Sequence, residues 1–278
     1  MIGCRTTTRA PWASWPTLTL ALALAAPLHA AEDGPAAAAP QQVEPARPVA
    51  DTDGRRTLAR LPANLGRTAI GVLSTDNIAP FIAGGAIAAG SSYLDEDVRT
   101  AATGQLGWSD TFETAGGPVY STLFVAGMFT AGRLSHGTRF RAMTYDMLDG
   151  AIVNFAYTEV LKLAIKRERP NGEDNKSFPS GHTSNAFALA SVVEAHYGWK
   201  IGVPSYLLAG LMGVSRIHQD KHWLSDVVAG AALGTIVGRT VVRLNSRSLE
   251  RVASGGATLS VSPMVARHAR GLSLSVVF

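Results

Sequence analysis

The chain has 278 residues, of which 46% are hydrophobic and 17% are charged. This composition is sufficient to bury one large core, and it excludes a chain that is disordered by composition. The formal net charge is only +4, and no basic stripe interleaved with aromatic residues occurs, so we expect no nucleic acid partner.

The first 30 residues have the pattern of a secretory signal. Two arginines precede an apolar stretch at 18–26, and small residues suited to cleavage end at Ala30. We therefore predict a signal peptide at 1–30 and export to the cell envelope, with an uncleaved anchor helix as the alternative. Cleavage would also remove Cys4, the single cysteine of the chain, so the mature protein would have no disulfide.

Residues 31–56 are rich in alanine, proline and glutamine, and we predict that they form a flexible linker. Apolar residues then recur at helical spacing from residue 57 to residue 245. Helices are expected near 57–75, 79–94, 117–134, 138–166, 181–198, 202–216 and 222–244. The fold class that follows is all-α, a multi-helix bundle.

Three of these segments bear on membrane association. Residues 77–94, 116–132 and 201–215 contain no Lys, Arg, Asp or Glu, but each is at or below the roughly 18–20 residues that a membrane span requires. We therefore favour a soluble or peripheral periplasmic protein, with an integral membrane protein as the alternative. The pattern does not indicate an oligomeric state.

The spacing of apolar residues changes in the final segment, 246–278. Apolar residues alternate with small polar residues at 257–263 and again at 271–278. We predict a C-terminal extension that contains a short β-hairpin.

Three separated clusters of polar residues could bind a tetrahedral dianion. Lys162, Arg169 and Arg216 supply three positive charges, and an arginine can bind two oxygens at once. Ser180 and Gly181 precede a predicted helix, where free backbone N–H groups and the helix dipole favour an anion. Together these residues predict a phosphate cradle.

Two histidines could supply the chemistry. His222 and Asp226 are four residues apart on a predicted helix, so the carboxylate can accept from one imidazole nitrogen and leave the other as a nucleophile. His182 is then available as a general acid for the leaving oxygen. We see no carboxylate cluster suited to a divalent metal ion.

Arranged along the chain, these residues form three motifs: Lys162-x6-Arg169-Pro170, Pro179-Ser180-Gly181-His182 and Ser215-Arg216-x5-His222-x3-Asp226. The set resembles the signature of the type 2 phosphatidic acid phosphatase superfamily, which also includes bacterial acid phosphatases and vanadium haloperoxidases. The resemblance covers residues 57–244, so the helical segment at 57–245 would be the catalytic domain.

The resemblance implies a role for each motif residue. His222 would form a phosphohistidine intermediate, Asp226 would orient it, and His182 would protonate the leaving alkoxide and later activate water. The phosphoryl oxygens would be held by Lys162, Arg169, Ser180, Gly181 and Arg216. Family members need no metal for this chemistry, so we expect no cofactor, and vanadate would act as an inhibitor or transition-state mimic.

The function expected from this resemblance is hydrolysis of a phosphate monoester. Its substrate would be a phosphorylated small molecule or a lipid phosphate, such as phosphatidic acid or a prenyl diphosphate. One alternative is a vanadium-dependent haloperoxidase, although such enzymes are usually much longer. The other is a non-catalytic envelope protein that retains the fold, although such a protein would be expected to lose a motif.

Four neighbours of the motifs have simpler interpretations. Glu159 is three residues before Lys162, and we expect a local ion pair. Lys166 and Arg167 are expected to solvate a helix end, or else to extend the positive field toward an anionic substrate. His218 is expected to be a loop or surface histidine.

Overall fold

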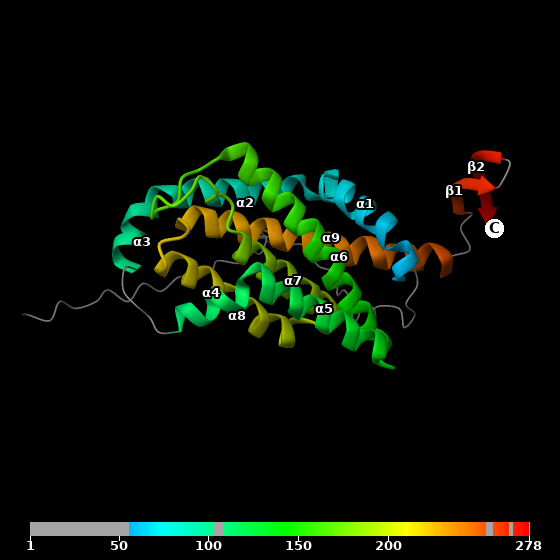
Figure 1. Cartoon of the computed structure of the whole chain (residues 1–278), viewed down its shortest axis with the longest axis horizontal. Coiled ribbons are helices and arrows are strands. Elements are labelled where there is room, and N and C mark those ends of the chain that lie inside the picture. Colours follow the sequence, from blue (N-terminus) through cyan, green and yellow to red (C-terminus); the bar gives the residue numbers. More distant parts are fainter. Residues whose placement is uncertain (1–55, 103–107, 254–257, 267–268, 278) are drawn as a thin grey trace, which may run out of the picture. The chain divides into compact units, whose positions relative to one another are not determined.

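The computed structural model describes residues 56–102, 108–253, 258–266 and 269–277. The predicted signal peptide at 1–30 and the predicted linker up to residue 55 lie outside the described residues. The described part is built of helices followed by one hairpin (Figure 1).

The helices confirm the predicted all-α bundle. They are α1 (Leu61–Val72), α2 (Ile78–Ser91), α3 (Asp95–Ala102), α4 (Ser109–Gly116), α5 (Pro118–Leu134), α6 (Thr138–Ile165), α7 (Gly181–Tyr197), α8 (Trp199–His218) and α9 (Leu224–Ala253). Single 3-10 turns at Leu58–Arg60, Thr75–Asn77 and Ser92–Leu94 precede α1, α2 and α3. The sequence pattern did not predict α3 and α4, because both are too short to show a clear apolar periodicity.

Helix α7 is central to the bundle and packs against α6, α8 and α9. Its contact with α9 is close because Gly230, Gly234 and Gly238 recur every four residues on the facing side. A Cβ atom at Gly230 would lie 2.6 Å from the carbonyl oxygen of Ser180, and one at Gly238 would lie 2.5 Å from that of Ala188. The glycines therefore let the start of α7 rest directly on α9.

Two groups of buried apolar side chains hold the helices together. Val72, Val153 and Val237 belong to a cluster that joins α1, α6 and α9. Met143, Met147 and Val192 belong to a second cluster that joins α6 to α7. Each large apolar side chain that is fully buried contributes about 1.5–3 kcal/mol to the free energy of folding. The first cluster therefore attaches α6 to α1 and α9, and the second attaches it to α7.

A buried polar network also crosses the bundle around Asp146. Arg56 binds both carboxylate oxygens at 2.9 Å, and Asn245 donates to one of them at 2.7 Å. The His196 Nε2 atom lies 2.9 Å from the second oxygen. Arg56 was the last residue of the predicted linker, but it is fully buried and belongs to the bundle. A buried guanidinium requires a charged partner, and the Asp146 carboxylate is that partner.

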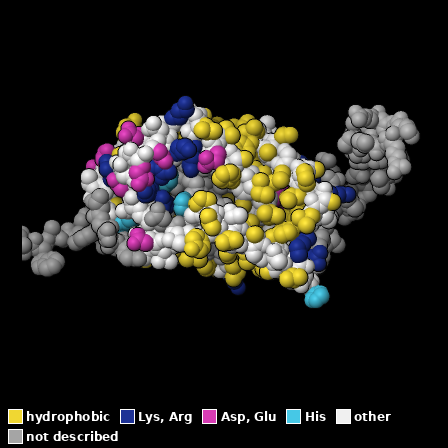
Figure 2. Space-filling view, in the orientation of Figure 1, with side chains coloured by type: hydrophobic (Ala, Val, Ile, Leu, Met, Phe, Trp, Pro, Cys, Tyr) yellow, Lys and Arg dark blue, Asp and Glu magenta, His cyan; other side chains and the backbone are white. Residues whose placement is uncertain are grey.

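Large apolar side chains are also exposed on the outside of the bundle. Figure 2 shows hydrophobic side chains spread widely over one face, whereas charged side chains gather toward the end where α3 lies. We call the exposed apolar set on α1, α2, α5, α6 and α8 the apolar belt. Its members include Ile70, Ile82, Ile87, Val119, Leu123, Phe124, Phe155, Val160, Leu163, Leu207 and Leu208.

By length and hydropathy alone, one segment in the described part of the chain is suited to cross a membrane. This segment is Leu224–Ser246 in α9, and half of its most apolar window is buried among other helices. A bent pair, Leu58–Val72 with Thr75–Ala102, passes the same test when it is taken together, with an angle of 55° between its halves.

The C-terminal region contains the hairpin. Helix α9 continues to Ala253, eight residues past the expected boundary at 245, and two strands follow: β1 (Thr258–Ala266) and β2 (Ala269–Val277). They pair antiparallel, with Thr258 opposite Val277 and Ala266 opposite Ala269.

Candidate active site

The loop between α6 and α7 carries half of the candidate site. Helix α6 ends where Lys166 takes the left-handed conformation, with φ of 50°. Backbone hydrogen bonds then hold the loop in place. The Ser177 N–H donates to the Arg167 carbonyl at 2.9 Å, and the Asn171 N–H donates to the Asp220 carbonyl at 3.1 Å. The second bond joins this loop to the α8–α9 turn, so the first and third motifs are held together.

The start of α7 is the position at which the sequence predicts anion binding. Ser180 is its N-cap residue and is fully buried, and its backbone N–H donates to the Asp226 carbonyl at 3.0 Å. The first N–H groups of a helix have no partner within that helix. A Cβ atom at Gly181 would lie 3.4 Å from the Lys162 Nζ atom, so the ammonium group reaches the same position.

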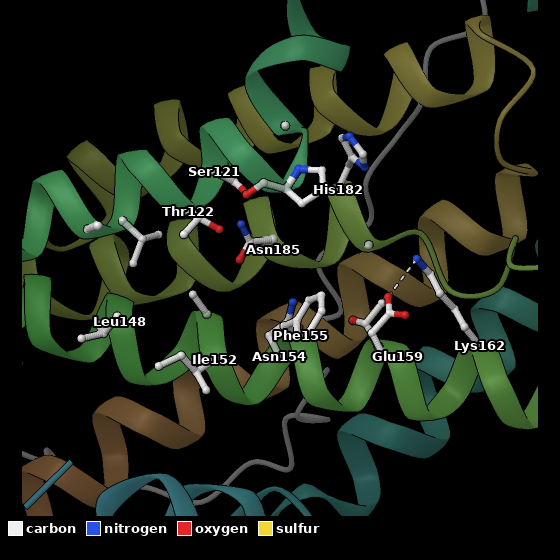
Figure 3. Close-up of a pocket in the computed structure, with 17 residues that line it drawn as sticks. Ser121, Thr122, Leu148, Ile152, Asn154, Phe155, Glu159, Lys162, His182 and Asn185 are labelled. Carbon is white, nitrogen blue, oxygen red and sulfur yellow. Dashed lines mark hydrogen bonds and ion pairs between the residues drawn. The ribbon is translucent and has the colours of Figure 1, made fainter. Parts of the chain in front are cut away.

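The expected ion pair beside this position is confirmed. The Lys162 Nζ atom lies 3.3 Å from the Glu159 Oε1 atom, and both side chains face the pocket in Figure 3. Glu159 therefore balances the lysine charge in the free protein. An arriving phosphate dianion would compete with it for the ammonium group.

His222 lies near both candidate arginines. Arg169 donates to the carbonyl oxygen of Lys221 at 3.2 Å, and the His222 N–H donates to the carbonyl oxygen of Arg216 at 3.3 Å. The imidazole is only 2% exposed. Burial, with the positive charges of Arg169 and Arg216, lowers the pKa of His222 from 6.5 to about 4, although Asp226 opposes the shift. The imidazole is therefore neutral near pH 7, as a nucleophile must be.

The predicted geometry of His222 and Asp226 needs one correction. We expected both residues on one helix, but His222 lies in the turn before α9, and only Asp226 is in the first helical turn. The His222 Nδ1 atom is 3.8 Å from the Asp226 Oδ2 atom. This distance is too long for a hydrogen bond but short enough for charge attraction.

Asp226 is held mainly by other groups. Its Oδ2 atom accepts from the Ser177 hydroxyl and from the Trp223 N–H, the latter at 2.9 Å. Its Oδ1 atom accepts from Arg167 Nη1 at 2.7 Å. The expectation that Arg167 merely solvates a helix end is therefore wrong, because its guanidinium binds the carboxylate that faces His222.

A pocket of about 460 Å³ opens beside the start of α7. Lys162, Gly181 and His182 line one end of it, and residues of α5 and α6 line most of the rest, together with Asn185 of α7 (Figure 3). His222, Arg169 and Arg216 do not line this pocket. The pocket therefore includes only part of the predicted phosphate position, at Lys162 and Gly181.

His182 is also fixed from the side of α4. A Cβ atom at Gly116 would lie 2.6 Å both from the His182 Cδ2 atom and from the Met212 sulfur. The end of α4 thus packs directly on the imidazole. In the part of the chain that the structure describes, no group of three or more His, Cys, Asp or Glu residues is arranged to hold a metal ion.

Comparison with known proteins places these motifs in a family. Residues 145–250, which include every motif residue, match the model of the PAP2 superfamily. The chain carries a PAP2 superfamily domain. This finding confirms the resemblance drawn from the three motifs.

Curated relatives match the chain over short segments. The chain is 44% identical over 80 residues to the lipid A 1-phosphatase of Porphyromonas gingivalis (28% of this chain, 18% of the relative). It is 34% identical over 85 residues to the lipid A 4'-phosphatase of Helicobacter pylori (31% and 37%). It is 33% identical over 101 residues to the decaprenylphosphoryl-5-phosphoribose phosphatase of Mycobacterium tuberculosis (33% and 55%). The matches thus span from about a fifth to about half of these relatives.

Two solved structures are similar at 21% sequence identity. One is the crystal structure of LpxE from Aquifex aeolicus, with a TM-score of 0.46 over 54% of this chain and 95% of that chain. The other is a transmembrane PAP2 type phosphatidylglycerolphosphate phosphatase from Bacillus subtilis, with a TM-score of 0.46 over 68% and 96%.

A second support of the site lies outside the matched PAP2 segment, on α3. The Asp95 carboxylate accepts from the Ser225 N–H at 2.9 Å, from the Ser225 hydroxyl at 2.7 Å and from Arg167 at 2.7 Å. It therefore caps α9 and holds Arg167 against Asp226. From the sequence we assigned neither a helix nor a role to residues 95–97, so we missed this support.

Helix α3 also clamps the α8–α9 turn. Arg99 binds Asp220 with two hydrogen bonds, at 2.7 and 2.9 Å. The guanidinium groups of Arg99 and Arg167 lie 5.4 and 5.5 Å from the ring centroid of Trp223, within the range of cation–π attraction. The residue next to His222 is therefore fixed by two arginines.

Proposed function

We propose that this protein is a metal-independent phosphatase that hydrolyses a lipid phosphate monoester through a phosphohistidine at His222. One observation carries the proposal: the pocket begins at Lys162, Gly181 and His182 and continues as a mainly apolar groove lined largely by α5 and α6. An anion position that opens into an apolar groove suits a phosphate joined to a hydrocarbon chain.

The phosphoryl group would be held by charge and by backbone donors. Lys162, Arg169 and Arg216 would supply the positive charges, and the first N–H groups of α7, which begins at Gly181, would donate to the phosphoryl oxygens. Such donors are fixed before the reaction, so they stabilise the added charge of the transition state without reorganisation.

The first chemical step transfers the phosphoryl group to His222. Because Nδ1 faces Asp226, the Nε2 atom attacks phosphorus, and the bond between phosphorus and the alcohol oxygen breaks. His182 donates a proton to the departing oxygen. Positive charge develops on the His222 ring, where the Asp226 carboxylate, held by Arg167, stabilises it.

The second step restores the protein. His182, now neutral, accepts a proton from water as the water oxygen attacks phosphorus. The phosphorus–nitrogen bond breaks, its electron pair returns to the Nε2 atom, and inorganic phosphate leaves. The lowered pKa of His222 favours this step, because a weakly basic imidazole is a good leaving group.

The apolar belt supports a lipid substrate and a location within the bilayer. Exposed apolar surfaces of this extent are rare on soluble monomers, whereas hydrocarbon chains can cover them without cost. We therefore infer that the protein is embedded in a membrane, in preference to the soluble arrangement that the sequence favoured.

Charge near the loops suggests an orientation. The end of the bundle away from the site carries Arg133, Arg139, Arg141 and Lys200 beside its two short connections at 135–137 and 198, with no acidic residue among 133–141 or 197–200. The end that carries the site has charges of both signs. Because positive charges near short loops stay on the cytoplasmic side, the site would face away from the cytoplasm.

Phosphate release tests the function directly. The full chain, purified in detergent, would be incubated with phosphatidic acid in mixed micelles, with EDTA, beside its His222→Ala variant. We expect EDTA-resistant release that orthovanadate inhibits and that the variant lacks. Equal release by the variant would contradict the nucleophile, and loss of release in EDTA would contradict the metal-independent mechanism.

A further inference from the structure

The pocket changes character along its length. In Figure 3, His182 and Lys162 lie at one end, and Leu148 and Ile152 lie at the other. Polar side chains from three helices lie between these ends. We call them the polar collar: Ser121 and Thr122 from α5, Asn154 from α6 and Asn185 from α7.

Asn154 has an unused hydrogen-bonding group. The residue is only 1% exposed, and its Oδ1 atom accepts from the Ser184 hydroxyl. Within the described residues, its Nδ2 group has no hydrogen-bond partner, although the side chain lines the pocket. The Nδ2 group is therefore available to a group that binds in the pocket, and it favours a ligand that carries a hydrogen-bond acceptor at this position.

Asn185 and Thr122 offer further unused groups. Asn185 is three residues after His182 on α7, hence on the same side of the helix. Neither the Asn185 amide nor the Thr122 hydroxyl makes a side-chain hydrogen bond to another residue in the described part of the chain, and both line the pocket. The Ser121 hydroxyl has only a long bond of 3.3 Å to the Pro118 carbonyl.

We propose that the polar collar binds the oxygen atoms of an acylated alcohol, and thereby selects a glycerolipid or acylated sugar phosphate over an isoprenoid phosphate. This inference rests on the proposed function. In an acylated alcohol, ester, amide or hydroxyl oxygens lie a few bonds from the phosphate. An isoprenoid phosphate has only hydrocarbon at those positions, so the collar amides would lose water without gaining a partner.

The order of groups in the pocket matches the order of groups in such a lipid. The phosphate would lie at Lys162 and Gly181, the leaving oxygen at His182, the oxygen-rich linkage at the collar and the acyl chain along Leu148 and Ile152. Both an acylated glycerol and an acylated sugar have this order, and the collar chemistry is shared by the two.

The test compares three substrates in identical detergent micelles: phosphatidic acid, an acylated glucosamine 1-phosphate and farnesyl phosphate. For the full chain we expect kcat/KM to be at least about tenfold higher for one of the acylated substrates than for farnesyl phosphate. The better acylated substrate identifies the source of the linkage. A ratio of one or below would overturn the proposal.

Two variants and a matched control connect this ratio to the collar. Asn185→Leu and Thr122→Val should each lower the ratio about three- to tenfold, mainly through slower turnover of the acylated substrate. Thr130→Val is the control, because Thr130 is on the same helix, its hydroxyl bonds the Ala126 carbonyl, and Thr130 itself does not line the pocket. It should leave the ratio unchanged.

The outcomes separate the two proposals. An unchanged ratio in both collar variants would overturn the role of the collar while leaving the phosphatase intact. Absence of phosphate release from all three substrates by the unaltered chain would overturn the proposed function itself, and with it this inference.

Discussion

Arg167 and Asp226 form an ion pair at 2.7 Å, and the same carboxylate lies 3.8 Å from the Nδ1 atom of His222. The candidate nucleophile is thus positioned by a chain of contacts that begins at Asp95 on α3 and passes through Arg167. Asp95 and Arg167 thus fix the carboxylate of Asp226, and that carboxylate acts on His222 by charge attraction.

Breaking this chain should slow turnover. In Arg167→Gln, Asp226 loses its charged partner, and we expect kcat to fall on the order of 100-fold with a smaller change in KM, because misplacement of a reacting group has a cost of this size. Arg167→Lys should recover part of the loss. Steady-state kinetics with phosphatidic acid would measure both.

The matched control is Arg239→Gln, since Arg239 also pairs with a carboxylate but is 62% exposed and lies on the distant part of α9. It should leave kcat unchanged. Equal kcat for Arg167→Gln and the unaltered chain would show that Arg167 does not position the site.

The pH dependence should reflect the lowered pKa of His222. The nucleophile must be neutral, so with a pKa of about 4 it remains active well below pH 6.5. Removing one positive neighbour, as in Arg169→Gln, should raise this pKa and move the acid limb of kcat/KM to higher pH. The ionisation of the substrate, near pH 6, is common to both proteins, so the difference between their profiles belongs to the protein. A shift to lower pH would contradict the assignment.

The lowered pKa of His222 also makes the stability of the fold depend on pH. The unfolded chain binds a proton at His222 with a pKa near 6.5, whereas the folded chain does so only near 4. The contribution of His222 to the free energy of unfolding is therefore fully present above pH 6.5. It is lost as the pH falls toward 4, by up to about 3 kcal/mol. In His222→Gln, the free energy of unfolding should fall less steeply over this range, as thermal unfolding at several pH values would record.

Gly230 should be essential for the geometry of α7. The Cβ atom of Gly230→Ala would meet the Ser180 carbonyl at 2.6 Å, so α7 must move away from α9. We expect a loss of about 1–3 kcal/mol in the free energy of unfolding and a marked fall in kcat/KM. Gly127→Ala on α5 is the control, since nothing lies within 4 Å of its added methyl group. If both variants behave alike, the close contact does not set the position of Ser180.

The general acid can be separated from the nucleophile by the leaving group. His182→Ala should reduce kcat on an alkyl phosphate lipid by about 10²–10³-fold. It should affect a nitrophenyl phosphate much less, because a phenolate can depart without a proton. Equal losses on the two esters would contradict the acid role of His182.

Membrane orientation can be measured with single cysteines. In a Cys4→Ser background, Lys176→Cys lies on the exposed loop at the site end, and His136→Cys lies in the exposed connection at the opposite end. In intact cells, a membrane-impermeant maleimide should label the first and spare the second until the cells are opened. The reverse pattern would contradict the proposed orientation, and loss of the protein from membranes in alkaline carbonate would contradict membrane insertion.

The sequence by itself predicted the all-α class, the long helices and the residues of the three motifs. Helical periodicity and motif spacing are local properties, so Lys162, His182 and His222 could be singled out before any contact was known. The ion pair of Glu159 with Lys162 was also predictable, because residues three apart on a helix share a face.

The supports of the site were decided only by the tertiary structure. Asp95 and Arg167 are 72 residues apart, and no local pattern relates an acidic helix start to a distant loop arginine. The turn that holds His222 outside α9 depends likewise on contacts with α3 and with the α6–α7 loop. The apolar belt has the same origin: periodicity shows that a helix has an apolar face, but only the packing of its neighbours decides whether that face is buried or left for lipid.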